Sequence, residues 1–160
     1  MDQSAQDIRH VKNAIRLAQV HSLAGHGGPF GALIVANDKI VARGWNKVTS
    51  SHDPTAHAEI VAIRAASRKL HLVHLSGCVL YTSCEPCPMC LAACYWARLD
   101  RVVFGAERAD AAAIGFSDDF IYREIPLGRS DRSLHMTQLL RNEAREVMGA
   151  WHADSNRATY

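Results

Sequence analysis

The chain has 160 residues, enough for one domain that buries about two thirds of the surface exposed on unfolding. Its 18 basic residues nearly balance 16 acidic ones with the signs interleaved, which argues against a nucleic-acid-binding surface and favours a small-molecule ligand. Five cysteines are an odd number, and no signal-peptide pattern opens the chain, so a secreted disulfide framework is not expected. No apolar run approaches the roughly 20 residues that span a bilayer. We therefore expect one domain over residues 1–160, without a membrane segment, in the reducing cytoplasm.

The first 25 residues predict an amphipathic helix. Apolar residues recur at helical spacing: Ile8, Val11, Ile15 and Ala18. Ser4 and Asp7 match a capping box at its start, and Gly25 ends it. This helix has a core face and carries little chemistry.

A glycine-rich segment, residues 25–31, follows and suits a loop where the backbone passes close to another group. Its one large apolar residue is Phe30, and the residue type leaves open whether it belongs to the core or to a pocket. Residues 32–36 and 39–44 predict two strands of a hairpin, because Asn37-Asp38 between them tolerates positive φ. Asn46, just past the second strand, is either a turn residue or a side chain that reads the edge of a ring.

The middle of the chain predicts a layered α/β domain. Asp53-Pro54-Thr55 supplies cap and first-turn chemistry for a helix to about residue 70, which places His57 and Glu59 in its first turn. A strand at 79–82, a helix at 87–98 and a strand at 101–105 form a βαβ pattern, which predicts parallel pairing. Residues 126–133 read as a polar linker and 138–151 as a last amphipathic helix.

A metal site is the strongest chemical prediction. Cys87 and Cys90 lie three residues apart at the start of a helix, so both thiolates point to one side and can bind one ion. His57 supplies a third ligand, which leaves a fourth position for water, as in a catalytic rather than a structural zinc site. Glu59 stands beside that water as a general base.

A second metal hypothesis uses only cysteines. The 2-2-3 gaps of an iron–sulfur run occur at Cys84, Cys87, Cys90 and Cys94. Tyr95 stands where such runs carry proline, and this hypothesis leaves His57 and Glu59 without a role. We expect Cys78 and Cys94 to pack as small apolar residues, whereas Cys84 belongs to the core or borders the site. His-x-Glu followed about thirty residues later by Pro-Cys-x-x-Cys is instead the signature of zinc deaminases.

Further motifs extend over nearly the whole chain: residues 27–32, 53–59, 81–90, 95–98 and 115–122. In these motifs the chain resembles the bacterial guanine deaminases of the cytidine-deaminase fold. The resemblance implies a three-layer α/β/α fold with a central mixed sheet, one Zn²⁺ per chain, and hydrolytic deamination of guanine to xanthine and ammonia. His57, Glu59 and the two cysteines indicate only the superfamily, whereas Trp96, the 115–122 block and Tyr160 indicate the guanine branch.

The resemblance also implies roles for residues outside the signature. The residues it places at a purine pocket are Phe30, Asn46, Trp96 and Asp118. Asp118 is the acid that assists proton transfer to the leaving group or binds the ring edge, although Asp119 is adjacent. Tyr160 closes the active site of a partner subunit, in a homodimer that exchanges the C-terminal segment 127–160. The individual role of residues 127–153 stays open.

Other functions remain to be separated from guanine deamination. The motif defines the reaction better than the substrate, so guanosine or another aminated purine or triazine-type heterocycle is the nearest alternative. A tRNA adenosine deaminase is less favoured, because no basic patch follows residue 123. A non-catalytic structural zinc or iron–sulfur module is the alternative of a different class.

Overall fold

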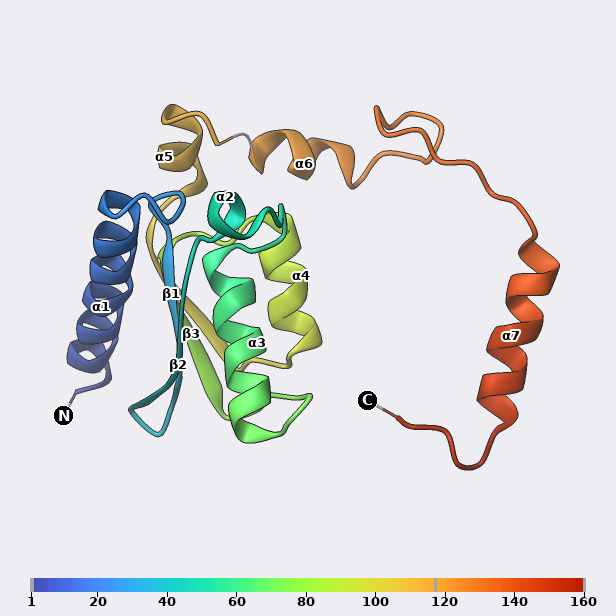
Figure 1. The fold of residues 1–160 in the computed structure, drawn as a ribbon, viewed down its shortest axis with the longest axis horizontal. Helices are drawn as coiled ribbons and strands as arrows, with labels where there is room; N and C mark the ends of the chain where they lie inside the picture. The colour runs from blue at the N-terminus through green and yellow to red at the C-terminus, as the bar shows by residue number, and fades with distance from the viewer. Residues whose placement is uncertain (1, 117, 160) are drawn as a thin grey trace. The chain divides into compact units, whose positions relative to one another are not determined.

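The structure, a computed structural model, describes residues 2–116 and 118–159. The chain divides into two compact units, the first reaching Asp119 and the second beginning at Phe120. The elements of the first unit are α1 (Gln3–Leu23), β1 (Gly31–Ala36), β2 (Lys39–Trp45), α2 (Val48–Ser51), α3 (Ala58–Leu70), β3 (Cys78–Cys84), α4 (Pro88–Trp96), β4 (Arg101–Ala106) and α5 (Arg108–Ala113) (Figure 1). Helix α6 (Asp118–Glu124) crosses the division, and α7 (Arg141–Ala153) lies in the second unit.

The four strands form one mixed sheet in the order β2-β1-β3-β4. β1 is antiparallel to both β2 and β3, whereas β3 and β4 are parallel, as the βαβ pattern predicted. The β1–β2 hairpin is also confirmed. Its turn residues Asn37 and Asp38 have φ values of 48° and 61°, the left-handed backbone that their side chains tolerate.

Helices cover both faces of this sheet, so the predicted three-layer α/β/α arrangement is confirmed. α1 packs on one face, and α3 and α4 lie together on the other (Figure 1). Alternate residues of β1 enter the two cores: Leu33 and Val35 pack under α1, and Ala32 and Ile34 pack under α3. Each fully buried Leu or Ile contributes about 2 kcal/mol to folding.

Gly44 fixes the start of α3 on the sheet. A Cβ at this position would lie 2.1 Å from the carbonyl oxygen of Ala58. Only a residue without a side chain therefore lets the first turn of α3 touch β2. This close approach positions His57, the residue immediately before that turn.

The predicted start of α3 was wrong. The helix begins at Ala58, and His57 is its N-cap. Asp53 instead accepts hydrogen bonds from the backbone N–H and the hydroxyl of Thr55, at 2.8 and 2.7 Å. This local Asx turn occupies the Asp53 side chain that the sequence offers as a helix cap. The helix therefore begins only after the turn.

The predicted capping box of α1 was also wrong. Asp2 is the N-cap, and its carboxylate accepts from the Ser4 N–H at 3.3 Å. Asp7 instead binds Arg101 at 2.7 and 3.0 Å and accepts a hydrogen bond from the Tyr81 hydroxyl at 2.6 Å. The Arg101 guanidinium lowers the pKa of Asp7 to about 2. Asp7 thus ties α1 to β3 and β4.

The second unit contains the predicted last amphipathic helix. α7 has no buried residue, and Val147, Met148 and Trp151 are 72%, 70% and 50% exposed. Tyr160 lies outside the described residues. The assignment of residues 1–160 to one domain and the exchange of segment 127–160 stay predictions. Across the part of the chain that the structure describes, no helix is both long and apolar enough to cross a membrane.

Candidate metal centre and substrate cavity

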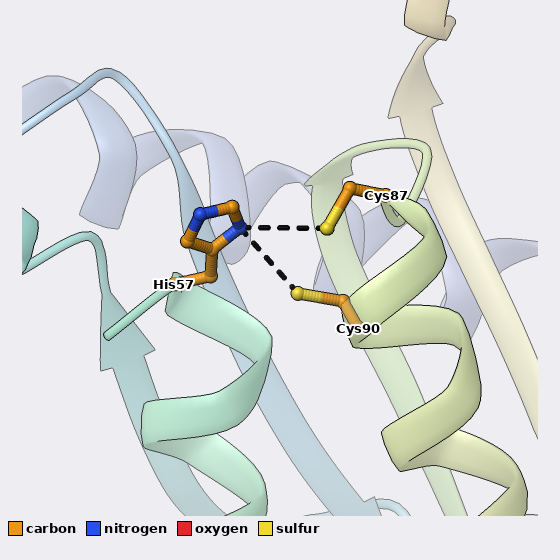
Figure 2. Close-up of side chains that lie close together, drawn as sticks. All are labelled: His57, Cys87 and Cys90. Atoms are coloured by element: carbon orange, nitrogen blue, oxygen red, sulfur yellow. Dashed lines mark hydrogen bonds between the residues drawn. The ribbon is translucent and has the colours of Figure 1, made fainter. Parts of the chain in front are cut away.

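The three predicted metal ligands meet where two helices begin. His57 is the N-cap of α3, and Cys87 is the N-cap of α4, with Pro88 at the first helical position. The His57 Nδ1 lies 3.6 Å from the Sγ atoms of both Cys87 and Cys90 (Figure 2). All three ligand atoms lie within 4.8 Å of one another. The spacing read from the sequence therefore corresponds to one cluster in space.

The electrostatics of the cluster fit a divalent metal ion. The hydrogen bond from the Cys90 thiol, together with contact to His57, lowers the pKa of Cys87 to about 4. Donation of that proton to Cys87, and burial, raise the pKa of Cys90. The Cys87 thiolate is thus already stable, and the Cys90 thiol that donates a hydrogen bond to it lies beside it. Two cysteines and one histidine form a set that binds zinc tetrahedrally with a fourth position open.

Glu59 is the carboxyl group beside this cluster. It is only 6% exposed, and burial raises its pKa. The Thr82 hydroxyl donates to its Oε1 at 3.3 Å, and the Cys90 thiol lies 3.5 Å from Oε2. A carboxyl group whose pKa is raised and whose orientation is fixed can accept a proton and return it.

A cavity of about 500 Å³ opens over Glu59 and the metal centre. This volume lies within the range of about 300–1,000 Å³ that is usual for small-molecule sites. His57, Glu59 and Cys87 line one part of it. Phe30 and Asn46, which the sequence left between structural and binding roles, line it as well.

Asn46 enters the cavity in a defined orientation. Its Oδ1 accepts hydrogen bonds from the backbone N–H groups of Gly28 and Val48, both at 3.2 Å. The side-chain oxygen is therefore occupied by the protein, and the Nδ2 hydrogens remain for a ligand. Gly27 permits this arrangement, because a Cβ there would lie 2.2 Å from the Asn46 carbonyl oxygen.

Phe116 is a cavity residue that the sequence analysis did not assign. Its ring meets Phe30 edge to face, with centroids 4.8 Å apart. In the sequence, Phe116 could be found only because it lies in the 115–122 motif. A single aromatic residue after a glycine shows no periodicity that would assign it to a pocket. Asp118 lines the same cavity, and burial raises its pKa. Among the described residues that line it, the adjacent Asp119 does not appear.

One predicted pocket residue is not among those that line the cavity, and another lies outside the part of the chain that the structure describes. Trp96 ends α4 and is 76% exposed, away from the residues that line the cavity. Tyr160 lies outside the described residues. Their roles in substrate binding stay predictions.

The remaining cysteines do not join the ligand cluster. Within the described chain, the metal-competent cluster contains His57, Cys87 and Cys90. Cys84 lines the cavity and its thiol donates to the Glu107 carbonyl at 3.6 Å, while burial raises its pKa to about 11. Cys78 and Cys94 are buried, as predicted. The iron–sulfur hypothesis thus has no geometric support here.

Residues 4–106 match the family described as the cytidine and deoxycytidylate deaminase zinc-binding region. The chain belongs to this deaminase family. Family membership and the geometry of His57, Cys87 and Cys90 together identify zinc as the cofactor.

Within the cytidine and deoxycytidylate deaminase family, the similarity to a guanine deaminase covers nearly the whole chain. The guanine deaminase of Bacillus subtilis is 49% identical over 150 residues, which are 94% of this chain and 96% of that protein. The X-ray structure of guanine deaminase from Bacillus subtilis superposes with a TM-score of 0.93 and 46% identity, covering 100% of this chain and 99% of the other. A tRNA-specific adenosine deaminase from Buchnera aphidicola is 45% identical, but over 67% of this chain and 70% of its own length.

Proposed function

We propose that this protein catalyses the zinc-dependent hydrolytic deamination of guanine to xanthine and ammonia. The observation that carries the proposal is the cavity. His57 and Cys87 of the metal-binding cluster and the buried carboxyl group of Glu59 line it, together with an oriented amide donor and two aromatic rings. The similarity to the Bacillus subtilis guanine deaminase over 94% of the chain supports guanine as the base.

His57, Cys87 and Cys90 are the proposed zinc ligands. Zinc, when bound, lowers the pKa of water from about 15.7 to about 7, a difference of about 12 kcal/mol that makes water a nucleophile at neutral pH. The protein keeps the ligand atoms in place through the starts of α3 and α4. The partial positive charge of each helix start stabilises the thiolates.

Glu59 is the proposed proton shuttle. Its carboxylate accepts one proton from the attacking water and passes it to the ring nitrogen beside C2. It then accepts the second proton from the hydroxyl group formed on C2, which becomes the carbonyl, and this proton goes to the amine. A C–O bond forms at C2, the C–N bond to the amine breaks, and ammonia leaves. The hydrogen bond from Thr82 keeps Oε1 oriented during both transfers. Asp118, in the same cavity, is the proposed acid that assists the proton transfer from Glu59 to the leaving group.

Phe30, Phe116 and Asn46 are the proposed base-binding residues. The aromatic pair provides apolar surface for a flat ring, and the Asn46 Nδ2 donates to an acceptor on the ring edge. Guanine offers such acceptors at its carbonyl oxygen and ring nitrogens.

A homodimer is the proposed assembly, with segment 127–160 exchanged between subunits. Helix α7 supports this assembly, because its apolar residues Val147, Met148 and Trp151 are exposed and could be buried by a partner subunit. In this dimer Trp96 and the partner's Tyr160 would complete the base pocket. The free thiols of all five cysteines support a reducing, cytoplasmic environment.

Ammonia release from zinc-loaded protein tests the proposal. We expect guanine to be turned over, with lower rates for guanosine, cytosine, adenine and an anticodon stem-loop RNA. Turnover of another compound with none of guanine would replace the substrate assignment. Absence of any turnover, or bound iron with visible absorbance, would indicate a non-catalytic metal module. The RNA is included because a tRNA-specific adenosine deaminase from Buchnera aphidicola matches 67% of the chain.

A further inference from the structure

Two histidines close the C-terminal end of α1. Gly25 has a φ of 72°, the Gly25 N–H donates to the Ser22 carbonyl at 3.0 Å, and the His26 N–H donates to the His21 carbonyl at 3.0 Å. These two bonds define a Schellman motif, which brings the side chains at positions 21 and 26 together. Apolar residues usually make this contact. Here two imidazoles make it, with their Nδ1 atoms 3.0 Å apart.

Neighbouring elements hold both imidazole-bearing residues in place. The His21 ring stacks on Trp45 at the end of β2, with centroids 3.7 Å apart and an interplanar angle of 2°. The Lys47 Nζ lies 4.2 Å from the centre of the Trp45 ring. The His26 carbonyl accepts a hydrogen bond from the Ser50 hydroxyl of α2 at 2.7 Å. The pair therefore joins α1, β2 and α2.

The segment that starts at His26 leads directly to the base-binding residue. Gly27 lies so close to Asn46 that a Cβ would meet its carbonyl oxygen at 2.2 Å. Gly28 then donates its N–H to the Asn46 Oδ1 at 3.2 Å and itself lines the cavity. A shift of residues 26–28 would release the bond that keeps the Asn46 Nδ2 available to a ligand.

We propose that His21 and His26 are positioning residues for substrate binding, whose mutual hydrogen bond holds residues 26–28 against Asn46. We call this pair the histidine latch. It deepens the proposed function and rests on it, because it acts through Asn46. The latch requires at least one neutral imidazole, since one Nδ1 must accept the hydrogen that the other donates.

Acid should open the latch. When both imidazoles are protonated, each Nδ1 carries a hydrogen and the two cations repel at 3.0 Å. The charged group that faces the pair is Lys47, and in the described chain neither imidazole forms an ion pair with a carboxylate. Burial, together with the charges of His26 and Lys47, lowers the pKa of His21. Because the pKa of His21 is lowered, the latch is closed at neutral pH and opens in acid.

Two variants separate the latch from a merely structural contact. His26→Ala removes the hydrogen bond, whereas the double variant His21→Leu with His26→Leu restores the apolar contact that the motif normally contains and cannot titrate. For His26→Ala we expect the KM for guanine to rise about five-fold at pH 7.5, the loss expected for one hydrogen bond, with kcat and zinc content retained. The KM of the unaltered enzyme should rise between pH 7 and pH 5.5, and the double variant should lack that rise.

Amide hydrogen exchange at Gly28 gives a second readout that needs no substrate. We expect protection of this amide to fall in His26→Ala, to fall in the unaltered protein at pH 5.5, and to stay unchanged in the double variant. An unchanged Gly28 amide in His26→Ala, or the same pH-dependent rise in KM in the double variant, overturns the latch. If the unaltered protein does not deaminate guanine, the proposed function fails, and the exchange experiment still decides whether the latch exists.

Discussion

The metal end and the base-binding end of the cavity are built in different ways. His57, Glu59 and Cys87 sit at the starts of α3 and α4, where core packing and helix geometry fix them. Asn46 and Phe116 lie outside the strands and longer helices, held by two backbone hydrogen bonds and one ring contact. In the proposed mechanism, bond cleavage thus rests on the rigid part of the fold, whereas the choice of base rests on loops that can vary.

The largest effect should come from the metal end. Glu59→Gln keeps the size and burial of the side chain but removes proton transfer, so we expect kcat to fall by about 10³–10⁴-fold with zinc retained. Steady-state kinetics and metal analysis check this. Near-normal kcat would show that another group carries the proton. Cys87→Ala is the matched control, and it should lose both zinc and activity.

Substitution of Asn46 should change substrate binding. We expect Asn46→Ala to lower kcat/KM about 10- to 100-fold with zinc retained, because the base loses a donor and two backbone N–H groups lose their acceptor. Asn46→Asp can still accept from both N–H groups but cannot donate to the base. Kinetics of the two variants thus separate these contributions. If Asn46→Asp keeps full activity, the donor has no role in recognition.

A smaller effect is expected at the aromatic wall. Phe116→Ala removes the edge-to-face contact with Phe30, worth about 0.5–1.5 kcal/mol, so KM should rise roughly 2- to 10-fold at constant kcat. Phe116→Leu keeps apolar surface, so its KM should lie between those of the unaltered protein and Phe116→Ala. Titration of guanine with each variant measures this. A fall in kcat without a change in KM would show that Phe116 contributes to the reaction step rather than to binding of the base.

The smallest catalytic effect should come from a contact outside both ends. Asp7→Asn weakens the contacts to Arg101 and Tyr81 and should cost about 1 kcal/mol of stability at pH 7 after allowance for solvent screening, with kinetics unchanged. Because the pKa of Asp7 is lowered from 3.8 to about 2, its stabilisation is present above pH 4 and disappears as pH falls towards 2. Urea unfolding at pH 7 and pH 3 measures the difference. An equal difference between the two proteins at both pH values would contradict this electrostatic account.

The sequence was sufficient for two of the three strand pairings and for the metal centre. The apolar run at residues 32–36 and the Asn37-Asp38 turn predicted the hairpin, and the βαβ pattern predicted the parallel pair, because these signals are local. Cys87 and Cys90 lie within one helical turn of each other, so their spacing carries their geometry.

Other features depend on long-range contacts that spacing does not encode. Asp7 looked like a helix cap, but Arg101 and Tyr81, far along the chain, bind it more strongly. The orientation of Asn46 depends on the hydrogen bonds that its Oδ1 accepts from the N–H groups of Gly28 and Val48. The position of Phe116 depends on its ring contact with Phe30. Trp96, which the resemblance placed at the pocket, is exposed in the structure.

The most direct test of the two-ended cavity is calorimetric binding of guanine to zinc-loaded Glu59→Gln. This variant should hold one zinc ion and one guanine per chain without turnover, and adding Asn46→Ala should weaken guanine binding about ten-fold or more while the zinc stays bound. If Glu59→Gln holds zinc but binds no guanine, or if Asn46→Ala leaves the affinity unchanged, the division between a metal end and a base-binding end is contradicted.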